Sequence, residues 1–518
     1  MRRFCRIFFS RYALCALFIL FEIALIAYFV FYFSIYSFAF LAMAAIINIL
    51  VFINLINKEI NPEFKLTWLV VVMLMPLLGG IIYIIFFPRR LSRRDAKFMK
   101  EMFSSMEEAE REGIGYISSD MALRAISEKS VSAAGRAYSL LADDSLARIY
   151  TGCVSSYFSS GEEFYQDLLH SLADAKKYIF IETFILAEGK MWNGIHSILS
   201  EKIREGVEVR ILYDDIGSMS SVPYNFDAKL REEGIECHRF GKVTPRLVAT
   251  HNNRDHRKIY IIDGESAYTG GINIADEYIN VKERFGHWKD GGIKLLGEAA
   301  RGFLKLFLGL YDLTVGSMSN YSEYFQRPES AVTDGTGFFI PFGSGPAPVY
   351  PTPVGKNTLE NIIDFAESYL YITTPYLILD YDLTEALRSA AKRGVDVRII
   401  TPGIPDKKLI KLMTKSAYPR LMEAGVRIFE YTKGFIHEKS VVCDGTLAMI
   451  GTINLDYRSL VHHFEDGVWI FDDEVVLDIR DGFMQTERSC LEILEADAKL
   501  SFTEKVIKNL VRIFAPLL

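Results

Sequence analysis

One stretch of this sequence occurs twice, as HRKIYIIDGESAYTGGIN at 256–273 and as HEKSVVCDGTLAMIGTIN at 437–454. Both copies share a histidine, a lysine, an aspartate, a glycine and an asparagine at identical spacing: His256, Lys258, Asp263, Gly270 and Asn273 in the first, and His437, Lys439, Asp444, Gly451 and Asn454 in the second. Because five fixed residues recur in register, the two stretches indicate one duplicated catalytic unit rather than a coincidence.

The duplication extends outward from these motifs. YIFI at 178–181 matches YLYI at 369–372, and GVEVRI at 206–211 matches GVDVRI at 394–399, in the same order. The separation far exceeds the period of a solenoid repeat, so the pattern predicts a duplicated domain. Expected strands at 178–181 and 207–213 lie on either side of an expected helix at 192–203. This alternation predicts an α/β fold with a parallel-type sheet in each half.

The motif residues have the chemistry of a phosphodiester site. Residues two apart on a strand share a face, so His256 and Lys258 should point the same way, as should His437 and Lys439. If the halves pack face to face, both pairs meet in one cleft. A lysine ammonium suits a phosphate oxygen, and an imidazole near neutral pH can either attack or donate a proton.

Other composition features exclude several classes of site and partner. Six cysteines lie scattered, without a CxxC pair or a Cys/His metal spacing, which is typical of thiols in a reducing compartment. We therefore expect neither a metal nor a cofactor. A net charge of −7 argues against nucleic acid as the main partner. The histidines outside the motifs are expected to be surface or hydrogen-bonded core residues: His170, His196, His238, His251, His287, His462 and His463.

The first part of the chain is strongly hydrophobic. Residues 12–56 contain one charged side chain, Glu22, which is enough apolar length for two spans at about 12–33 and 36–56, and a third is expected at about 66–87. Arginines and lysines lie both before residue 12 and after residue 88. Three spans would place these clusters on opposite sides. Either the first segment does not span, or the larger second cluster fixes a cytoplasmic main body, which we favour.

These patterns divide the chain into six parts. The expected parts are a transmembrane region (1–90), a basic and charged connector (91–139), a first α/β domain (140–315), a Ser-, Gly-, Asn- and Pro-rich linker (316–337), a second α/β domain (338–500) and an amphipathic segment (501–518). The last segment could dock onto the protein or lie at a membrane interface.

The paired His-x-Lys-x4-Asp-x6-Gly-x-x-Asn pattern resembles the phospholipase D superfamily. Trp68, Pro76 and Tyr83 in the last hydrophobic segment, FGHWKD at 285–290 and the closing PLL at 516–518 resemble bacterial cardiolipin synthases. The likeness covers nearly the whole chain apart from its first hydrophobic segment. One departure is that Gly271 and Thr452 stand where many members of the superfamily have serine.

The resemblance implies two tandem phospholipase D-like α/β domains that face each other after an all-α transmembrane region. It also implies transfer of a phosphatidyl group from one phosphatidylglycerol to another, giving cardiolipin and glycerol. His256 would attack phosphorus to form a phosphatidyl-histidine. His437 would protonate the leaving glycerol and then deprotonate the incoming hydroxyl.

The resemblance assigns supporting roles to the remaining site residues. Lys258 and Lys439, helped by Asn273 and Asn454, would hold the charge on the phosphate oxygens. Asp290 and Glu465 would orient the histidines. Asp263 and Asp444, although part of the catalytic motif, are expected to brace the local structure rather than to touch the substrate.

Three other functions remain open on the sequence. The same residues could transfer the phosphatidyl group to water, serine or ethanolamine. A membrane scaffold with an inactive duplicated domain is disfavoured because both copies keep every motif residue. A nuclease is disfavoured by the acidic net charge and the hydrophobic segments. The oligomeric state is left open.

Overall fold

The computed structural model describes residues 20–21, 24, 28, 34–58, 60–75, 78–87, 93–114, 119–242, 253–326 and 335–514. They form two compact units, a helical one within residues 1–89 and a larger α/β one within 90–244 and 251–508; the described residues from 509 to 514 group with the helical unit. The longer helices are α3 (Ser34–Ile56), α4 (Pro62–Leu74), α5 (Gly79–Phe86), α6 (Arg93–Ile114), α7 (Ser119–Lys129), α8 (Val131–Asp143), α9 (Gly161–Asp174), α10 (Lys190–Arg204), α12 (Phe226–Glu232), α13 (Ala300–Val315), α15 (Val354–Phe365), α16 (Tyr381–Lys392), α17 (Lys408–Met422), α18 (Val475–Glu487) and α19 (Phe502–Phe514). Short helices are α11 (Asp215–Ser218), α14 (Tyr321–Tyr324), a 3-10 turn at Asp276–Ile279 and a π turn at Arg458–His462.

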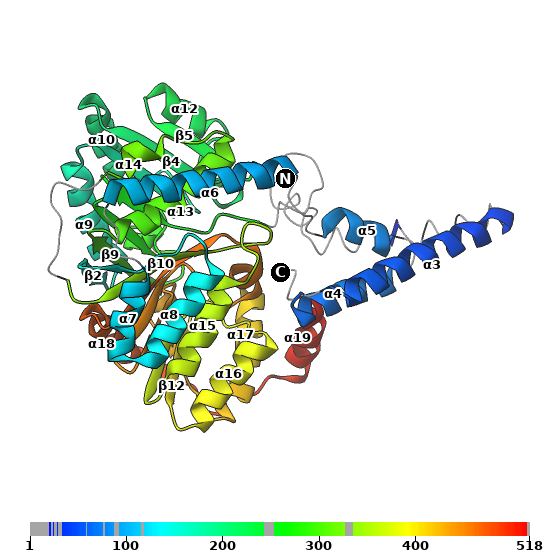
Figure 1. The fold of residues 1–518 in the computed structure, drawn as a ribbon. Coiled ribbons are helices and arrows are strands. Elements are labelled where there is room, and N and C mark those ends of the chain that lie inside the picture. Colours follow the sequence, from blue (N-terminus) through cyan, green and yellow to red (C-terminus); the bar gives the residue numbers. More distant parts are fainter. Residues whose placement is uncertain are drawn as a thin grey trace. The chain divides into compact units, whose positions relative to one another are not determined.

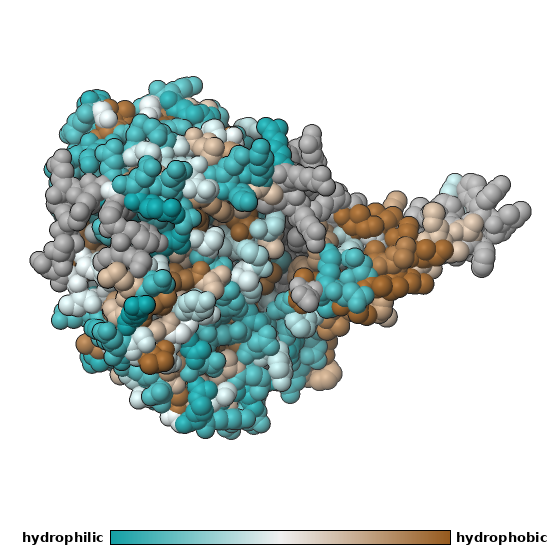
Figure 2. Space-filling view, in the orientation of Figure 1, coloured by the Kyte–Doolittle hydropathy of each residue, from teal (hydrophilic) through white to brown (hydrophobic). Residues whose placement is uncertain are grey.

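The helical unit is held together by aromatic packing. Trp68 of α4 is buried and lies edge-on to Tyr83 of α5, with ring centroids 5.5 Å apart. α5 approaches α4 closely at Gly79, where a Cβ atom would lie 2.7 Å from the Cα of Val72. The exposed side of α3 is apolar at Ile46, and hydrophobic residues cover much of this unit, drawn brown in Figure 2.

None of the helices in the described ranges is both long and apolar enough to cross a membrane. The predicted segment 12–33 lies mostly outside the described residues. The predicted segment 36–56 coincides with α3, whereas 66–87 falls in two helices, because α4 ends at Leu74 and α5 begins at Gly79. The sequence between them contains Pro76, a residue that disfavours an uninterrupted helix.

The first half of the α/β unit contains a seven-stranded sheet (Figure 1). Its strands are, in order across the sheet, β2 (Val154–Phe158), β9 (Gly292–Leu296), β7 (Ser266–Gly270), β6 (Ile259–Ile262), β3 (Tyr178–Thr183), β4 (Glu208–Asp214) and β5 (Glu236–Phe240). The predicted strands and helix are present as β3, β4 and α10. The sheet is mixed rather than wholly parallel: β3, β4 and β5 run parallel, while β6, β7, β9 and β2 pair antiparallel.

The second half repeats this topology. Its sheet has the order β1 (Tyr150–Thr151), β10 (Phe338–Ser344), β17 (Glu465–Phe471), β16 (Leu447–Gly451), β15 (Ser440–Cys443), β11 (Tyr369–Thr373), β12 (Asp396–Pro402), β13 (Arg427–Tyr431) and β18 (Cys490–Glu492). Taken in their order across the sheet, the seven strands that begin with β10 and end with β13 match the seven strands of the first sheet, which begin with β2 and end with β5. The edge strand β1 pairs with β10, so a segment expected in the first domain joins the second sheet.

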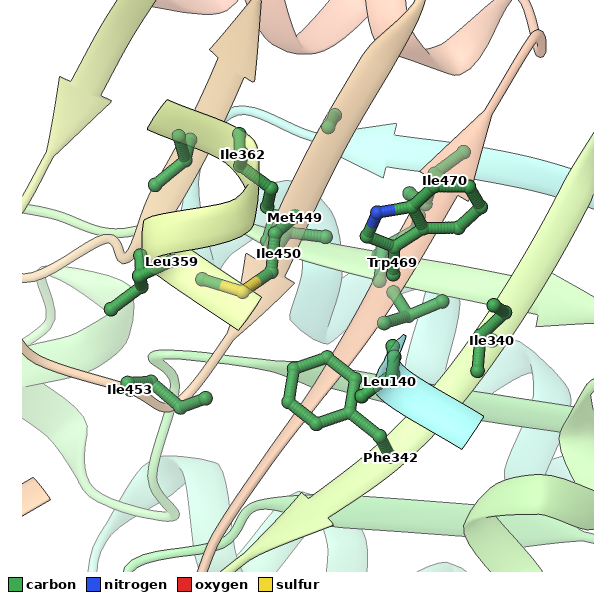
Figure 3. Close-up of a cluster of buried hydrophobic side chains, with 14 of the residues drawn as sticks. Leu140, Ile340, Phe342, Leu359, Ile362, Met449, Ile450, Ile453, Trp469 and Ile470 are labelled. Atoms are coloured by element: carbon green, nitrogen blue, oxygen red, sulfur yellow. The ribbon is translucent and has the colours of Figure 1, made fainter. Parts of the chain in front are cut away.

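The expected connector is part of the hydrophobic core. α6 and α8 are amphipathic, and their Met102, Met106 and Ala137 are buried in the same cluster as the sheet residues. α8 packs beside α15, and Figure 3 shows Leu140 close to Phe342 and Trp469. The expected linker also contributes, because Tyr321 and Tyr324 of α14 are buried within it. Buried aromatic and aliphatic side chains thus pack the expected connector and linker against the core of the α/β unit.

Both motif aspartates end a strand in a tight Asp-Gly turn. Asp263 after β6 and Asp444 after β15 have φ angles of 55° and 54° and are each followed by a glycine at 67°. Such turns need positive φ, which Asp and Gly tolerate. The carboxylate of Asp263 accepts three backbone N–H groups at 176–178, at 2.7–2.8 Å, and Asp444 accepts the equivalent three at 367–369, at 2.7–2.9 Å. Each aspartate therefore fixes the start of a central strand.

We expect Asp444→Ala to lower the free energy of unfolding by about 1.5–3 kcal/mol, because three backbone donors lose an ionised acceptor. Asp481→Ala provides a matched control, since this aspartate is exposed on α18 and its loss should change stability by less than about 0.5 kcal/mol. Thermal denaturation of the purified variants measures the difference. Equal midpoints for the Asp444 variant and wild type would contradict the bracing role.

Candidate active site

Each motif histidine is held by the opposite half of the α/β unit. His256, just before β6, donates its backbone N–H to the carbonyl oxygen of Phe464 at 2.9 Å. His437, just before β15, donates to the carbonyl oxygen of Lys289 at 2.7 Å. Nearby, β8 (His287–Lys289) and β14 (Gly434–Ile436) form a parallel pair between the halves. These exchanges bring both histidines into one buried site.

The orienting carboxylates also cross between the halves. Glu465 Oε2 lies 2.9 Å from His256 Nδ1, and Asp290 Oδ2 lies 2.9 Å from His437 Nδ1. Both carboxylates are fully buried. A hydrogen bond from Nδ1–H to a carboxylate fixes the tautomer and leaves the Nε2 lone pair for chemistry. The sequence predicted which carboxylates face the histidines, although their exchange between halves is a finding of the structure.

Two lysines supply the positive charge of the site. Lys258 and Lys439 are buried, and each Nζ donates to the carbonyl oxygen of the histidine two residues earlier, His256 and His437 respectively. Burial lowers the pKa of Lys258 to about 8 and that of Lys439 to about 7, although nearby carboxylates oppose the shift. An anion bound between the two ammonium groups would restore their positive charge.

Both motif histidines are neutral near pH 7. Burial, followed by Lys258 and Lys439, holds the pKa of His256 well below its ordinary value. Burial and Lys439 lower the pKa of His437 to about 4, against the opposing effect of Asp290. Burial alone would raise the pKa of Asp290, but His437 and Lys439 make the net shift downward. Asp290 therefore remains ionised beside His437.

The two motif asparagines brace the walls of the site. Asn273 accepts from the backbone N–H of Ile185 at 2.9 Å and donates to the hydroxyl of Tyr278 at 2.6 Å. The ring of Tyr278 in turn packs edge-on against His437, with centroids 5.5 Å apart. Asn454 donates to Ser459 Oγ at 3.1 Å. Both asparagines thus contact neighbouring groups of the fold, and their direct contact with phosphate stays a prediction.

The glycine at 271 has a steric explanation. A Cβ atom on Gly271 would lie 2.0 Å from Asp290 Oδ1 and 2.7 Å from the carbonyl oxygen of His437. A serine there would displace the carboxylate that orients His437. The equivalent Thr452 fits, and its hydroxyl exchanges hydrogen bonds of 2.9 and 3.2 Å with the backbone of Asp466.

Aromatic rings enclose both histidines. Trp288 lies 5.4 Å from His437 between ring centroids, and Phe184 lies 5.0 Å from His256. His463 also packs against His256, at 5.6 Å, and is 7% exposed. His463 is a core residue and not a surface one, and its ring nitrogens have no hydrogen-bond partner among the described residues, with Nδ1 3.7 Å from Glu465 Oε1. The sequence held one signal for this contact, because His463 lies two residues before Glu465 just as Trp288 lies two residues before Asp290.

One cluster has a spacing that metal ligands could adopt. His256, His463 and Glu465 each place one nitrogen or oxygen within 4.8 Å of the others. The electrostatic field of Lys258 and Lys439, however, acts on His256 and favours an anion over a divalent cation. Among these three residues the structure shows one hydrogen-bonded contact, between His256 and Glu465.

Comparison with known proteins identifies relatives of the whole chain. A family model described as the phospholipase D-like domain of cardiolipin synthase matches residues 168–283 and 359–486, and one described as a phospholipase D-nuclease N-terminal region matches 46–86. An uncharacterised protein of Streptococcus mutans is 36% identical, over 90% of this chain and 98% of its own length. A cardiolipin synthase of Alkalihalophilus pseudofirmus is 32% identical, over 88% of this chain and 90% of its own length.

A solved structure shares the fold. Phosphatidylserine synthase from Haemophilus influenzae superposes with a TM-score of 0.54 at 16% identity, covering 70% of this chain and 93% of that one. Together with the repeated motif and the matched sheets, the full-length relatives show that this chain belongs to the cardiolipin synthase family of phospholipase D-like enzymes.

Proposed function

We propose that this protein is a phosphatidyltransferase that joins two phosphatidylglycerol molecules into cardiolipin and releases glycerol. The observation that carries the proposal is the pair of crossed histidine–carboxylate contacts beside two buried lysines. This arrangement offers a nucleophile, a proton carrier and cationic stabilisation for one phosphodiester. The cardiolipin synthases among the relatives support the choice of product.

In the first step, His256 Nε2 attacks the phosphorus of one phosphatidylglycerol. The bond from phosphorus to the glycerol oxygen breaks, and a proton from His437 goes to that oxygen, so glycerol leaves. In the second step, His437 takes the proton of the terminal hydroxyl of a second phosphatidylglycerol. That oxygen attacks phosphorus, the phosphorus–nitrogen bond breaks, and His256 is regenerated.

The unequal surroundings of the histidines support this order. His256 carries the positive influence of Lys258, Lys439 and His437, all of which favour its neutral, nucleophilic form. Asp290 favours the protonated form of His437, as a general acid requires. A phosphodiester anion between the lysines would further stabilise protonated His437.

A cavity of the α/β unit, lined by apolar and basic side chains, fits an amphiphilic, anionic substrate. It measures about 640 Å³ and lies among α6, β5 and α13, with Phe98, Leu310 and Phe464 in its lining. Arg94 and Lys242 also line it. An apolar lining with basic residues suits an acyl chain that carries a phosphate.

We further propose a multi-pass membrane protein with its catalytic domains, at about 140–315 and 338–500, in the cytoplasm. The hydrophobic segments of the sequence, the basic cluster after residue 88 and the matched N-terminal family region support this placement. α19 adds an interfacial candidate, since Phe502 and Leu510 are exposed beside Lys505 and Lys508.

Purified protein given phosphatidylglycerol alone should form cardiolipin and glycerol in equal amounts, because both substrates are then the same lipid. Thin-layer chromatography and glycerol release measure the two products. Phosphatidic acid without cardiolipin would instead identify a hydrolase, which is the alternative function. Product formation only after addition of serine or ethanolamine would identify another acceptor.

Replacement of either His256 or His437 by Ala should lower kcat by at least about 10³-fold, because each removes a nucleophile or a proton carrier. His170→Ala is a matched control, since this histidine is exposed on α9 away from the motifs. Its activity should equal that of wild type. Normal turnover in either motif variant would rule out the two-histidine mechanism.

The value of kcat/KM should fall as pH rises through about 7–8. The pKa of Lys439 is lowered to about 7 and that of Lys258 to about 8, so raising the pH removes the positive charges that attract the phosphodiester. Lys439→Arg should move this limb to higher pH, since arginine stays charged. Initial rates in mixed micelles across pH 5–9 test this; a flat profile above pH 7 would contradict it.

A further inference from the structure

The two halves of the site differ at one matched position. Two residues before each orienting carboxylate lies a ring that packs on the histidine which that carboxylate orients. In one half it is Trp288, with its centroid 5.4 Å from that of His437. In the other it is His463, 5.6 Å from His256. The matched position therefore packs a ring on a motif histidine in both cases, an indole on His437 and an imidazole on His256.

Trp288 completes the hydrogen bonding of its carboxylate. Its indole N–H donates to Asp290 Oδ2 at 3.3 Å, and the backbone N–H of Gly291 donates to Oδ1 at 3.0 Å. Both oxygens of Asp290 therefore accept a hydrogen bond in addition to the contact that Oδ2 makes with His437 Nδ1. This holds the carboxylate in the orientation that the catalytic ring requires.

Around His256, the matching polar atoms of the orienting carboxylate and its neighbouring ring are not hydrogen-bonded to one another. Glu465 Oε1 and both ring nitrogens of His463 are buried and have no hydrogen-bond partner among the described residues. His463 Nδ1 lies 3.7 Å from Glu465 Oε1, which is slightly too long for a hydrogen bond. Buried polar atoms without partners are costly, and closing this gap would satisfy one atom on each residue at once.

We propose that His463 is a positioning residue for the nucleophile, donating Nδ1–H to Glu465 Oε1 and thereby holding that carboxylate on His256. It is the counterpart of Trp288 in the other half. The inference rests on the proposed function only in taking His256 as the nucleophile. It assigns His463 no contact with the substrate.

The surroundings of His463 keep it a neutral donor. Burial lowers its pKa to about 3, with His256 and Arg458 acting in the same direction and Glu465 opposing them. Besides burial, Lys258, Lys439 and His437 lower the pKa of His256 from the rest of the site. A donor on Glu465 weakens the pull of that carboxylate on the imidazolium form of His256. Loss of the donor should therefore raise the pKa of His256.

The test compares His463→Phe, which keeps a ring but has no N–H, with His463→Asn, which keeps an N–H donor. We expect the Phe variant to lose about 10-fold in kcat and to show an acid limb of kcat/KM at higher pH, in keeping with one lost hydrogen bond to a charged group. The Asn variant should stay within about threefold of wild type and keep its acid limb. Trp288→Phe serves as the matched change in the other half and should leave the acid limb in place.

Equal losses in the Phe and Asn variants, or an unchanged acid limb in the Phe variant, would overturn the proposal. If the Phe variant does not fold, ¹⁵N spectra of histidine-labelled wild type decide, since Nδ1–H on His463 is expected and a bare Nδ1 would overturn it. These outcomes are separate from failure of the proposed function, in which wild type itself would make no cardiolipin.

Discussion

The site depends on two hydrogen bonds that cross between the halves of the α/β unit. Glu465 of the second half orients His256 of the first, and Asp290 of the first half orients His437 of the second. Neither half alone holds a histidine with its carboxylate. The duplication therefore matters for chemistry as well as for folding, because each copy supplies what the other lacks. The backbone bonds from both histidines to the opposite half fix this exchange.

The charges of the site indicate how it is prepared for substrate. Two lysines are buried close to two neutral histidines, and their pKa values are lowered because burial outweighs the opposing effect of nearby carboxylates. In the proposed mechanism, a bound phosphodiester adds a further negative charge and favours protonation of the general acid in the same event. Binding of the phosphodiester and protonation of His437 would thus result from the same change in local charge. In the proposed mechanism, the different surroundings of His256 and His437 distinguish the nucleophile from the proton carrier.

The sequence predicted much of this architecture. The matched motifs indicated a duplicated α/β domain. Strand periodicity did not apply to the motif histidines and lysines, because β6 begins at Ile259 and β15 at Ser440, after both pairs. The bracing of Asp263 and Asp444 was also anticipated, and both accept three backbone donors. What the sequence could not supply was contact between distant segments. The crossing of Glu465 and Asp290, the docking of α8 into the core and the place of His463 against His256 all depend on tertiary packing. Local periodicity carries no information about such contacts.

In the proposed mechanism Asp290 acts on the proton carrier His437 in both steps, while Glu465 orients the nucleophile His256. Mass spectrometry of peptides from enzyme quenched during turnover tests it most directly, using Asp290→Asn and Glu465→Gln. We expect the phosphatidyl group trapped in the Asp290 variant to lie on the peptide containing His256, and the Glu465 variant to carry almost none. A phosphatidyl group on the peptide containing His437 in either variant would contradict it.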